Sequence, residues 1–271
     1  MNKYQDMVVI FVDLLGTKNN VNFDDKFFIH QLFHSEAKMN EARNLSHVIY
    51  QRKVYSFSDC AYFFYYYKDG IEESRKDNMK LLQIAMSNTS ISLLRIINAG
   101  YLVRGGIALE KAYLDELGFF GPAVEKAYCL ESNYSDVPMI ALPPELGKQF
   151  YEWEEKNTNM ELAQLLFTDV VRLVEKDKDK YFLNLFFQLE QFSESLHLEN
   201  EVLNIEKVKH NIMKTIKRDK EKYKDQSSSG EKKKATIYEK LDWFEKYIQE
   251  KHNHLKPDIV EGAISTLYQP Y

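Results

Sequence analysis

The sequence contains little cysteine: Cys60 and Cys129 are too few for a disulfide framework or a four-thiolate metal site. Such low cysteine usage is typical of a reducing compartment, and we interpret both thiols as small buried packing residues. The sequence also lacks any apolar run near the roughly 20 residues that a membrane-spanning helix needs. The apolar stretch at 7–12 is cut short by Asp13, so we expect no signal peptide. We therefore expect a cytoplasmic protein without a membrane partner.

An excess of positive charge is also absent. The 271 residues include 36 Lys plus Arg and 41 Asp plus Glu, which gives a formal net charge of −5. This mild acidity argues against a surface that tracks nucleic acid or an anionic membrane. A lysine-rich stretch at 214–234 is interpreted as a solvated helix face and loop, because acidic residues dilute it and few aromatic residues could stack on bases. Nucleic acid is therefore not an expected partner.

The first part of the chain alternates between strand-like and helix-like patterns. Residues 8–12 form a short β-branched apolar run, typical of a strand that is covered on both faces. The runs at 48–57 and 61–67 predict two strands joined by a tight hairpin with Asp59 at or beside its tip. Further predicted elements are a helix within 72–98, a strand at 101–107 with close-packing glycines, a helix from Gly121–Pro122 to Glu131, a strand at 139–142 and a hairpin of strands 170–174 and 181–187.

The last part of the chain has a helical pattern. Apolar residues recur every three or four positions in two stretches, and each set predicts one apolar helix stripe. A lysine- and serine-rich stretch at 220–235 separates them and predicts a flexible connection. We therefore expect an α/β catalytic domain at 1–195 and a helical extension at 196–271. The stripes consist of Ile205, Val208, Ile212 and Ile216, and of Ile237, Leu241, Phe244 and Ile248.

Two acidic residues occupy positions suited to chemistry. Asp13 ends the first predicted strand, and Asp59 lies in the predicted hairpin turn. If the strands are neighbours, both carboxylates face one edge, where paired carboxylates can hold two divalent cations roughly 3.5–4 Å apart. Mg²⁺ suits such a site, and Gly16–Thr17 would present backbone N–H groups at a helix start to a polyphosphate. The alternative is that Asp13 is a helix N-cap and Asp59 an ordinary turn residue.

Four segments in series resemble the motifs of class III nucleotide cyclases. Phe11–Thr17 is similar to their first metal-binding motif, and Phe57–Ala61 is similar to the second, in a hairpin. Arg104–Ile107 resembles the strand after their second helix, and Phe120–Glu131 resembles their glycine-initiated helix. The resemblance covers residues 5–190 in the same order. It implies a class III cyclase-like α+β sandwich, a mostly antiparallel sheet flanked by helices.

The resemblance also implies an activity, that of a metal-dependent phosphorus–oxygen lyase. In this family the 3′-oxygen of a nucleoside triphosphate attacks its own α-phosphorus and expels pyrophosphate, and the protein mainly positions groups and stabilises charge. Asp13, Asp59 and the backbone carbonyl of Leu14 would hold two Mg²⁺ or Mn²⁺ ions. Family members are similar in forming head-to-tail homodimers, so base and transition-state contacts would come from the partner subunit.

Departures from the family pattern bear on the substrate. Tyr55 stands where adenylyl cyclases carry a base-reading lysine, and Pro122 where an aspartate often reads adenine. Glu125 aligns with the ribose-orienting asparagine, and Cys129 with the transition-state arginine. Loss of the purine-reading pair resembles the pyrimidine cyclases of Pycsar anti-phage systems, which make cyclic UMP or cyclic CMP for a separate effector. We accordingly expect Leu14, Gly16, Thr17, Tyr55, Pro122 and Glu125 to bind UTP or CTP.

The missing arginine leaves the developing negative charge without its usual cation. Arg104 and Lys126 are the predicted replacements, with Lys111 behind them, although Arg104 could equally form a structural salt bridge. Two other functions stay open at this point. One is a purine nucleotide cyclase with unconventional base contacts. The other is a catalytically inactive cyclase-like fold that binds a nucleotide or a protein partner.

Overall fold

The computed structural model describes residues 3–17, 22–42, 48–135, 137–157, 171–191, 195–198, 201–223 and 237–250. The strands are β1 (Gln5–Leu14), β2 (Tyr50–Phe57), β3 (Cys60–Tyr67), β4 (Val103–Leu114), β5 (Phe119–Phe120), β6 (Ile140–Leu142), β7 (Val174–Asp177), β8 (Lys180–Leu183), β9 (Ser195–Leu198) and β10 (Glu201–Asn204). The α-helices are α1 (Phe23–Ala42), α2 (Asn78–Asn98), α3 (Pro122–Asn133), α4 (Pro144–Asn157), α6 (Phe187–Gln191), α7 (Ile205–Lys222) and α8 (Ile237–Glu250), and a 3₁₀ turn spans Glu73–Arg75. No helix in these ranges is long and apolar enough to cross a bilayer.

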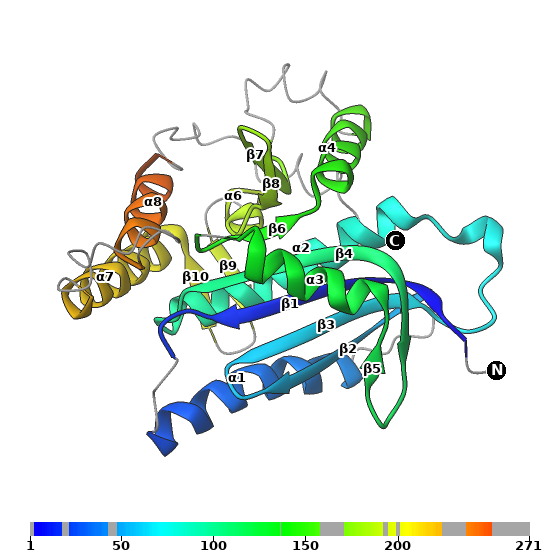
Figure 1. Cartoon of the computed structure of the whole chain (residues 1–271), viewed down its shortest axis with the longest axis horizontal. Coiled ribbons are helices and arrows are strands. Elements are labelled where there is room, and N and C mark those ends of the chain that lie inside the picture. The colour runs from blue at the N-terminus through cyan, green and yellow to red at the C-terminus, as the bar shows by residue number, and fades with distance from the viewer. Residues whose placement is uncertain are drawn as a thin grey trace.

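Eight strands form one sheet in the order β2-β3-β1-β4-β6-β8-β7, with β5 paired to β4 (Figure 1). Every pairing is antiparallel except that of β4 with β6, which is parallel. Apart from the 3₁₀ turn, the first six elements, β1-α1-β2-β3-α2-β4, follow the order of a split β-α-β fold. The predicted mostly antiparallel sheet with flanking helices is therefore confirmed.

Strand β1 lies in the middle of the sheet and is buried on both faces, as its continuous apolar run predicts. Val8, Ile10 and Val12 belong to the larger core, on the face covered by α2. The alternate residues belong to a second core on the face covered by α3. At the end of β1, Asp13 is paired in register with Cys60 of β3 and Arg104 of β4. The hairpin and the start of β4 are thereby brought to the end of β1.

The two faces of the sheet are covered differently (Figure 1). Residues of α1, α2, α7 and α8 belong to the larger core, so both C-terminal apolar stripes are buried except for Ile237, which is 41% exposed. The opposite face of β1 and β4 is covered by α3. A Cβ atom at Gly106 would collide with the backbone of Ala127 and the side chain of Leu130, so glycine is what lets α3 lie against β4. The domain boundary at residue 195 stays a prediction.

Several element boundaries differ from those predicted. The helix expected within 72–98 begins at Asn78, because the carboxylate of Asp77 accepts the N–H groups of Met79 and Lys80 at 2.9 and 3.1 Å and caps it. The second hairpin differs from the predicted strands 170–174 and 181–187: its first strand begins only at Val174, its second ends at Leu183, and its turn contains Lys178 with φ of 56°. Most of the predicted connection at 220–235, with the lysines at 224 and 232–234, lies outside the described residues.

Several elements were not predicted from the sequence. They are helices α1, α4 and α6, the short strand β5 and the two-stranded hairpin of β9 and β10. In α1 the aromatic residues do not fall on one face: Phe33 is buried, whereas Phe23 and Phe27 are exposed and stack on each other. Without a single stripe, this helix gives little periodic signal.

Candidate functional site

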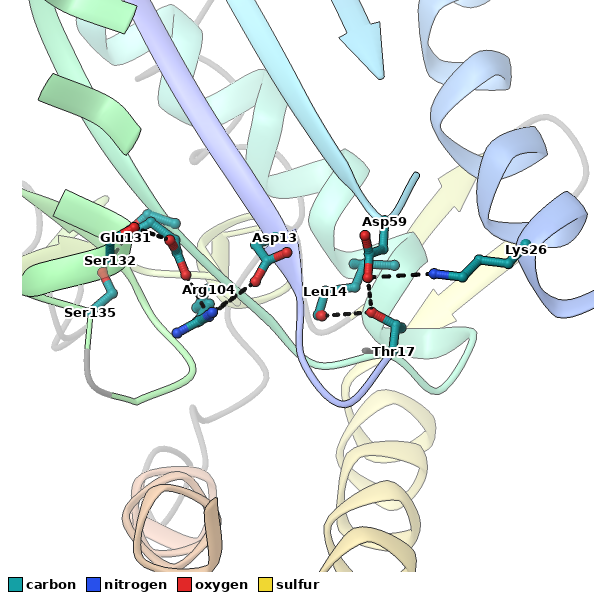
Figure 2. A network of polar contacts seen from close by, with 10 residues as sticks. Asp13, Leu14, Thr17, Lys26, Asp59, Arg104, Glu131, Ser132 and Ser135 are labelled. Atoms are coloured by element: carbon teal, nitrogen blue, oxygen red, sulfur yellow. Dashed lines mark hydrogen bonds and ion pairs between the residues drawn. The ribbon is translucent and has the colours of Figure 1, made fainter. Parts of the chain in front are cut away.

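The geometry of the site begins with the tight turn between β2 and β3. Ser58 adopts φ of 54°, in the left-handed region, which allows the two-residue turn Ser58–Asp59. The carbonyl of Asp59 accepts the N–H of Leu14 at 3.0 Å. The turn is therefore fixed against the end of β1, and the side chains of Asp13 and Asp59 lie on neighbouring strand ends (Figure 2).

These strand ends open onto a cavity of about 540 Å³, a size within the usual range for small-molecule sites. Several parts of the chain that are far apart in sequence form its walls. The strand ends supply Asp13, Leu14, Leu15, Gly16, Thr17, Ser58, Asp59 and Arg104, with Pro138 and with Lys26 from α1 beside them. The C-terminal helices supply Asp219 and Tyr223 from the end of α7, and Ile237, Lys240 and Leu241 from the first turns of α8.

Asp13 is held by Arg104. The guanidinium donates to one carboxylate oxygen of Asp13 from Nε at 3.1 Å and from Nη2 at 3.0 Å. The same Nε lies 2.6 Å from Glu131, whose side chain is only 5% exposed, but its hydrogen points to Asp13, so the Glu131 contact is an ion pair. Burial raises the pKa of Asp13 above its ordinary value, although the contact with Arg104 opposes this rise, and the charges of Glu131 and Asp59 add to it.

Asp59 has different partners. Its carboxylate accepts a hydrogen bond from the Thr17 hydroxyl and pairs with Lys26 Nζ at 3.5 Å. The Thr17 hydroxyl also lies 3.0 Å from the carbonyl oxygen of Leu14. Burial alone would raise the pKa of Asp59, but the hydrogen bonds from Thr17 and Ser58 and the charge of Lys26 outweigh it, so the pKa lies below its ordinary value. Two adjacent carboxylates thus have opposite pKa shifts.

The donor set is compatible with hard divalent cations. Two carboxylates and one backbone carbonyl, that of Leu14, are oxygen ligands of the kind that Mg²⁺ and Mn²⁺ accept together with phosphate oxygens and water. The carboxylates of Asp13 and Asp59 are near enough for the charge of one to raise the pKa of the other. Within the described ranges, no three His, Cys, Asp or Glu residues gather as a metal cluster. Any ion here would therefore depend on substrate or water for its remaining ligands.

The structure divides the predicted site residues into two groups. Asp13, Leu14, Gly16, Thr17, Asp59 and Arg104 line the cavity. Tyr55 does not: its ring packs against Phe64 and Phe119, and its hydroxyl donates to the carbonyl of Asp115 at 2.6 Å. Pro122, Glu125, Lys126 and Cys129 lie on the exposed face of α3, outside the cavity of their own chain.

The two lysines proposed as alternative cations have surface partners. Lys126 pairs with Glu110, and both side chains are more than one-third exposed, at 43% and 37%. Lys111 pairs with Asp6 at 2.8 Å, also at the surface. Neither lysine lines the cavity of its own chain. Within one chain, Arg104 is therefore the member of the predicted cation set nearest to the carboxylates.

Two interpretations made from the sequence are wrong. Cys60 is buried, and burial raises the pKa of its thiol to about 12, but Cys129 is exposed on α3 and is not a packing residue. Gly16–Thr17 do not begin a helix, because α1 starts only at Phe23. Gly16 instead lies in a turn with φ of 78°, and Thr17 acts through its hydroxyl.

Four charged residues of the site were missed by sequence reasoning. Glu131 was noted as the end of a helix, but not as the second partner of Arg104. Lys26, Asp219 and Lys240 come from helices whose packing brings them to the strand ends. No local motif marks these three residues. The signal that could have pointed to Asp219 is its place on the apolar stripe of α7, where it is buried.

Comparisons with known proteins give little further information. No family model and no curated protein sequence matches the chain. Among solved structures, a bacterial light-regulated adenylyl cyclase is similar at 12% identity with a TM-score of 0.36. The match covers 70% of this chain and 57% of that chain, so the chain spans somewhat more than half the length of that protein. We therefore draw the function from the cavity itself.

Proposed function

We propose that the protein is a nucleotide cyclase that converts UTP or CTP to the 3′,5′-cyclic monophosphate and pyrophosphate. The observation that carries this proposal is the pair Asp13 and Asp59, which project from adjacent strand ends into one cavity beside the carbonyl of Leu14. Arg104 and Lys26 lie in the same cavity. In-line transfer at phosphorus requires carboxylates that bind divalent metal ions, and it requires cationic side chains nearby that bind the phosphates.

In the proposed reaction, the 3′-oxygen of the substrate forms a bond to the α-phosphorus. The bond from that phosphorus to the oxygen bridging to the β-phosphate breaks, pyrophosphate leaves, and the 3′-hydroxyl proton passes to solvent. Bound Mg²⁺ or Mn²⁺ would supply the positive charge that acidifies the 3′-hydroxyl and neutralises the phosphates. Asp13, Asp59 and the Leu14 carbonyl would hold the ions and so fix the reacting atoms in line.

The ion pairs of the cavity support a role for its cations in catalysis. Arg104 is bound to Asp13, and Lys26 to Asp59. When divalent ions neutralise these carboxylates, Arg104 and Lys26 become available to phosphate oxygens. Arg104 would keep its contact with Glu131, which holds the guanidinium at the edge of the cavity. It would thus act as the cation that stabilises charge developing on the phosphates, in place of the missing arginine at Cys129.

The base-reading half of the site is proposed to come from a second copy in a head-to-tail homodimer. Tyr55 lies outside the cavity of its own chain, as do Pro122, Glu125 and Cys129 on the exposed face of α3. A partner that presents this surface to the cavity would complete the site. The cyclic pyrimidine nucleotide would act on a separate effector as an anti-phage signal in the cytoplasm.

A second candidate function is non-catalytic nucleotide binding. It is favoured by the ion pairs of Asp13 and Asp59, because these carboxylates are already neutralised by protein cations. Such a cavity could bind a nucleotide through Arg104 and Lys26 without a metal ion. A third candidate function is a purine nucleotide cyclase, which differs from the first candidate only in the base of its substrate.

Incubation with each of the four nucleoside triphosphates and Mn²⁺, followed by product mass measurement, separates these functions. We expect a cyclic monophosphate from UTP or CTP, its loss in Asp59→Ala, and full activity in Asp6→Ala, a control at a surface ion pair of the same sheet. A product from ATP or GTP alone would contradict the pyrimidine assignment. Nucleotide binding without turnover in the folded wild-type protein would establish the second candidate.

A further inference from the structure

The C-terminal helices form one wall of the cavity that holds Asp13 and Asp59. The end of α7 packs against the turn that follows β1: a Cβ atom at Gly16 would lie 3.8 Å from a carboxylate oxygen of Asp219 and 3.9 Å from the Tyr223 hydroxyl. Lys240 and Leu241 of α8 line the same cavity. In Figure 2, α7 and α8 lie directly below the strand ends.

This wall is held at a fixed position relative to the sheet. On α7, Asn211 donates to the side chain of Asn98 at the end of α2 at 2.8 Å, and the apolar stripe is buried in the larger core. Lys220 joins α7 to α8 because its ammonium contacts both Asp242 and Glu245, the latter at 2.5 Å. The first turns of α8 are therefore held where their side chains reach the cavity.

The cavity lining carries equal numbers of acidic and cationic side chains, and one of the acids, Asp219, is also paired with Arg218 Nε at 2.8 Å. The lining includes three carboxylates, those of Asp13, Asp59 and Asp219, and three cationic side chains, those of Lys26, Arg104 and Lys240. Divalent ions on Asp13 and Asp59 would leave the cavity with an excess of positive charge. An excess of this sign suits a polyanion. Figure 2 shows Arg104 beside Asp13 and Lys26 beside Asp59, at opposite ends of the carboxylate pair, and Lys240 adds a third cation to the lining from α8.

We propose that Lys240 of α8 binds the phosphate chain of the substrate, so that the helical extension is part of the polyphosphate site. This inference rests on the proposed function for the identity of the substrate as a nucleoside triphosphate. The partial burial of Lys240 strengthens its attraction for a phosphate relative to that of a fully exposed lysine. Lys240 lines the cavity together with Leu241, so α8 contributes a cationic side chain to the same cavity as Asp13 and Asp59.

The test is equilibrium binding of inorganic triphosphate to the full chain, measured by calorimetry with Mn²⁺ present. Lys240→Met keeps the apolar stem and removes the charge, and Lys246→Met is the matched control on the exposed face of the same helix. We expect Lys240→Met to weaken binding roughly tenfold to a hundredfold, the usual effect of losing a charged hydrogen bond. Lys240→Arg should restore binding to within a few-fold, and Lys246→Met should leave it unchanged.

Unchanged triphosphate binding in folded Lys240→Met, or no binding by the wild-type chain, would overturn this inference. Turnover provides the second readout, in which the KM for the nucleotide should rise in Lys240→Met with a smaller change in kcat. If the wild-type protein makes a cyclic nucleotide and Lys240→Met has the same KM, the inference fails while the proposed function stands. If triphosphate binding depends on Lys240 but no nucleotide is cyclised, the proposed function fails while the polyphosphate site stands.

Discussion

The cavity at the strand ends and the exposed face of α3 hold the two halves of the predicted site, and they differ in how their charges are held. In the cavity, Asp13, Arg104 and the buried Glu131 form a connected ion-pair group. On α3, Lys126 pairs with Glu110 at the surface, and Cys129 is exposed. One chain thus gathers the predicted cation-binding and phosphate-binding residues in one cavity, whereas the residues predicted to read the base lie outside it. Under the proposed function, the difference teaches that a second copy would have to complete the active site.

The largest expected effect tests whether the cavity, and not the exposed face of α3, binds the metal ions. Asp13→Asn should lower turnover roughly a thousandfold or more and abolish high-affinity Mn²⁺ binding, because a neutral amide cannot hold a divalent cation as a carboxylate does. Glu125→Gln on α3 should leave Mn²⁺ binding unchanged, since Glu125 lies outside the cavity. Mn²⁺ titration followed by electron paramagnetic resonance measures both. Equal loss of Mn²⁺ binding in the two variants would remove the distinction between the regions.

The next effect compares how much the Arg104–Glu131 and Lys126–Glu110 ion pairs contribute to the free energy of unfolding. Arg104→Met should lower the free energy of unfolding by roughly 3 kcal/mol, because it leaves the Glu131 carboxylate buried without its cation. Lys126→Met should change it by less than about 1 kcal/mol, since the pair with Glu110 is largely exposed. Urea denaturation of the three proteins gives these values. Similar stabilities for Arg104→Met and the wild type would show that Glu131 does not depend on Arg104.

A smaller effect, on substrate selectivity, is expected from changing Tyr55, which is predicted to contact the base. Tyr55→Ala should change the ratio of kcat/KM for a pyrimidine over a purine triphosphate by about tenfold, the scale on which one pocket contact discriminates. Its Mn²⁺ affinity should stay the same, because Tyr55 packs against Phe64 and Phe119, away from the carboxylates. Competition assays with UTP, CTP and ATP measure the ratio. Unaltered selectivity would mean that Tyr55 does not read the base.

The smallest effect is a shift along the pH axis. A carboxyl with a raised pKa takes up its proton at a higher pH than usual, so acidification should neutralise Asp13 before Asp59, whose pKa is lowered. Mn²⁺ affinity should therefore fall with decreasing pH as Asp13 is protonated. Arg104→Met should move this fall to higher pH, because Arg104 lowers the pKa of Asp13. An unmoved profile from Mn²⁺ titrations at several pH values would contradict this assignment.

Local patterns were sufficient to predict much of the fold. The continuous β-branched run predicted β1, and the polar pair between two apolar runs predicted the hairpin turn at Ser58–Asp59. Glycine followed by proline predicted the start of α3, and two regular stripes predicted α7 and α8. In each case the signal is local, because periodicity and backbone preference depend on neighbouring residues alone.

The site residues that could not be predicted from the sequence depend on contacts between distant parts of the chain. Lys26 reaches Asp59 because α1 packs beside the hairpin, and Lys240 reaches the cavity because α8 packs on α7 through apolar contacts and the ion pairs of Lys220. Neither lysine belongs to a motif. Glu131 could be placed on a helix from the sequence, but its burial against Arg104 follows from the close approach of α3 to Gly106 of β4. Such approaches are properties of tertiary packing and leave little trace in periodicity.

The most direct test of the central claim is a crystal structure of the full chain with Mn²⁺ and a non-cyclisable UTP or CTP analogue. Anomalous scattering should show two Mn²⁺ peaks roughly 3.5–4 Å apart between the carboxylates of Asp13 and Asp59, with the triphosphate against them. A nucleotide bound in the cavity with Asp13 still paired to Arg104, Asp59 still paired to Lys26 and no Mn²⁺ between them would contradict it.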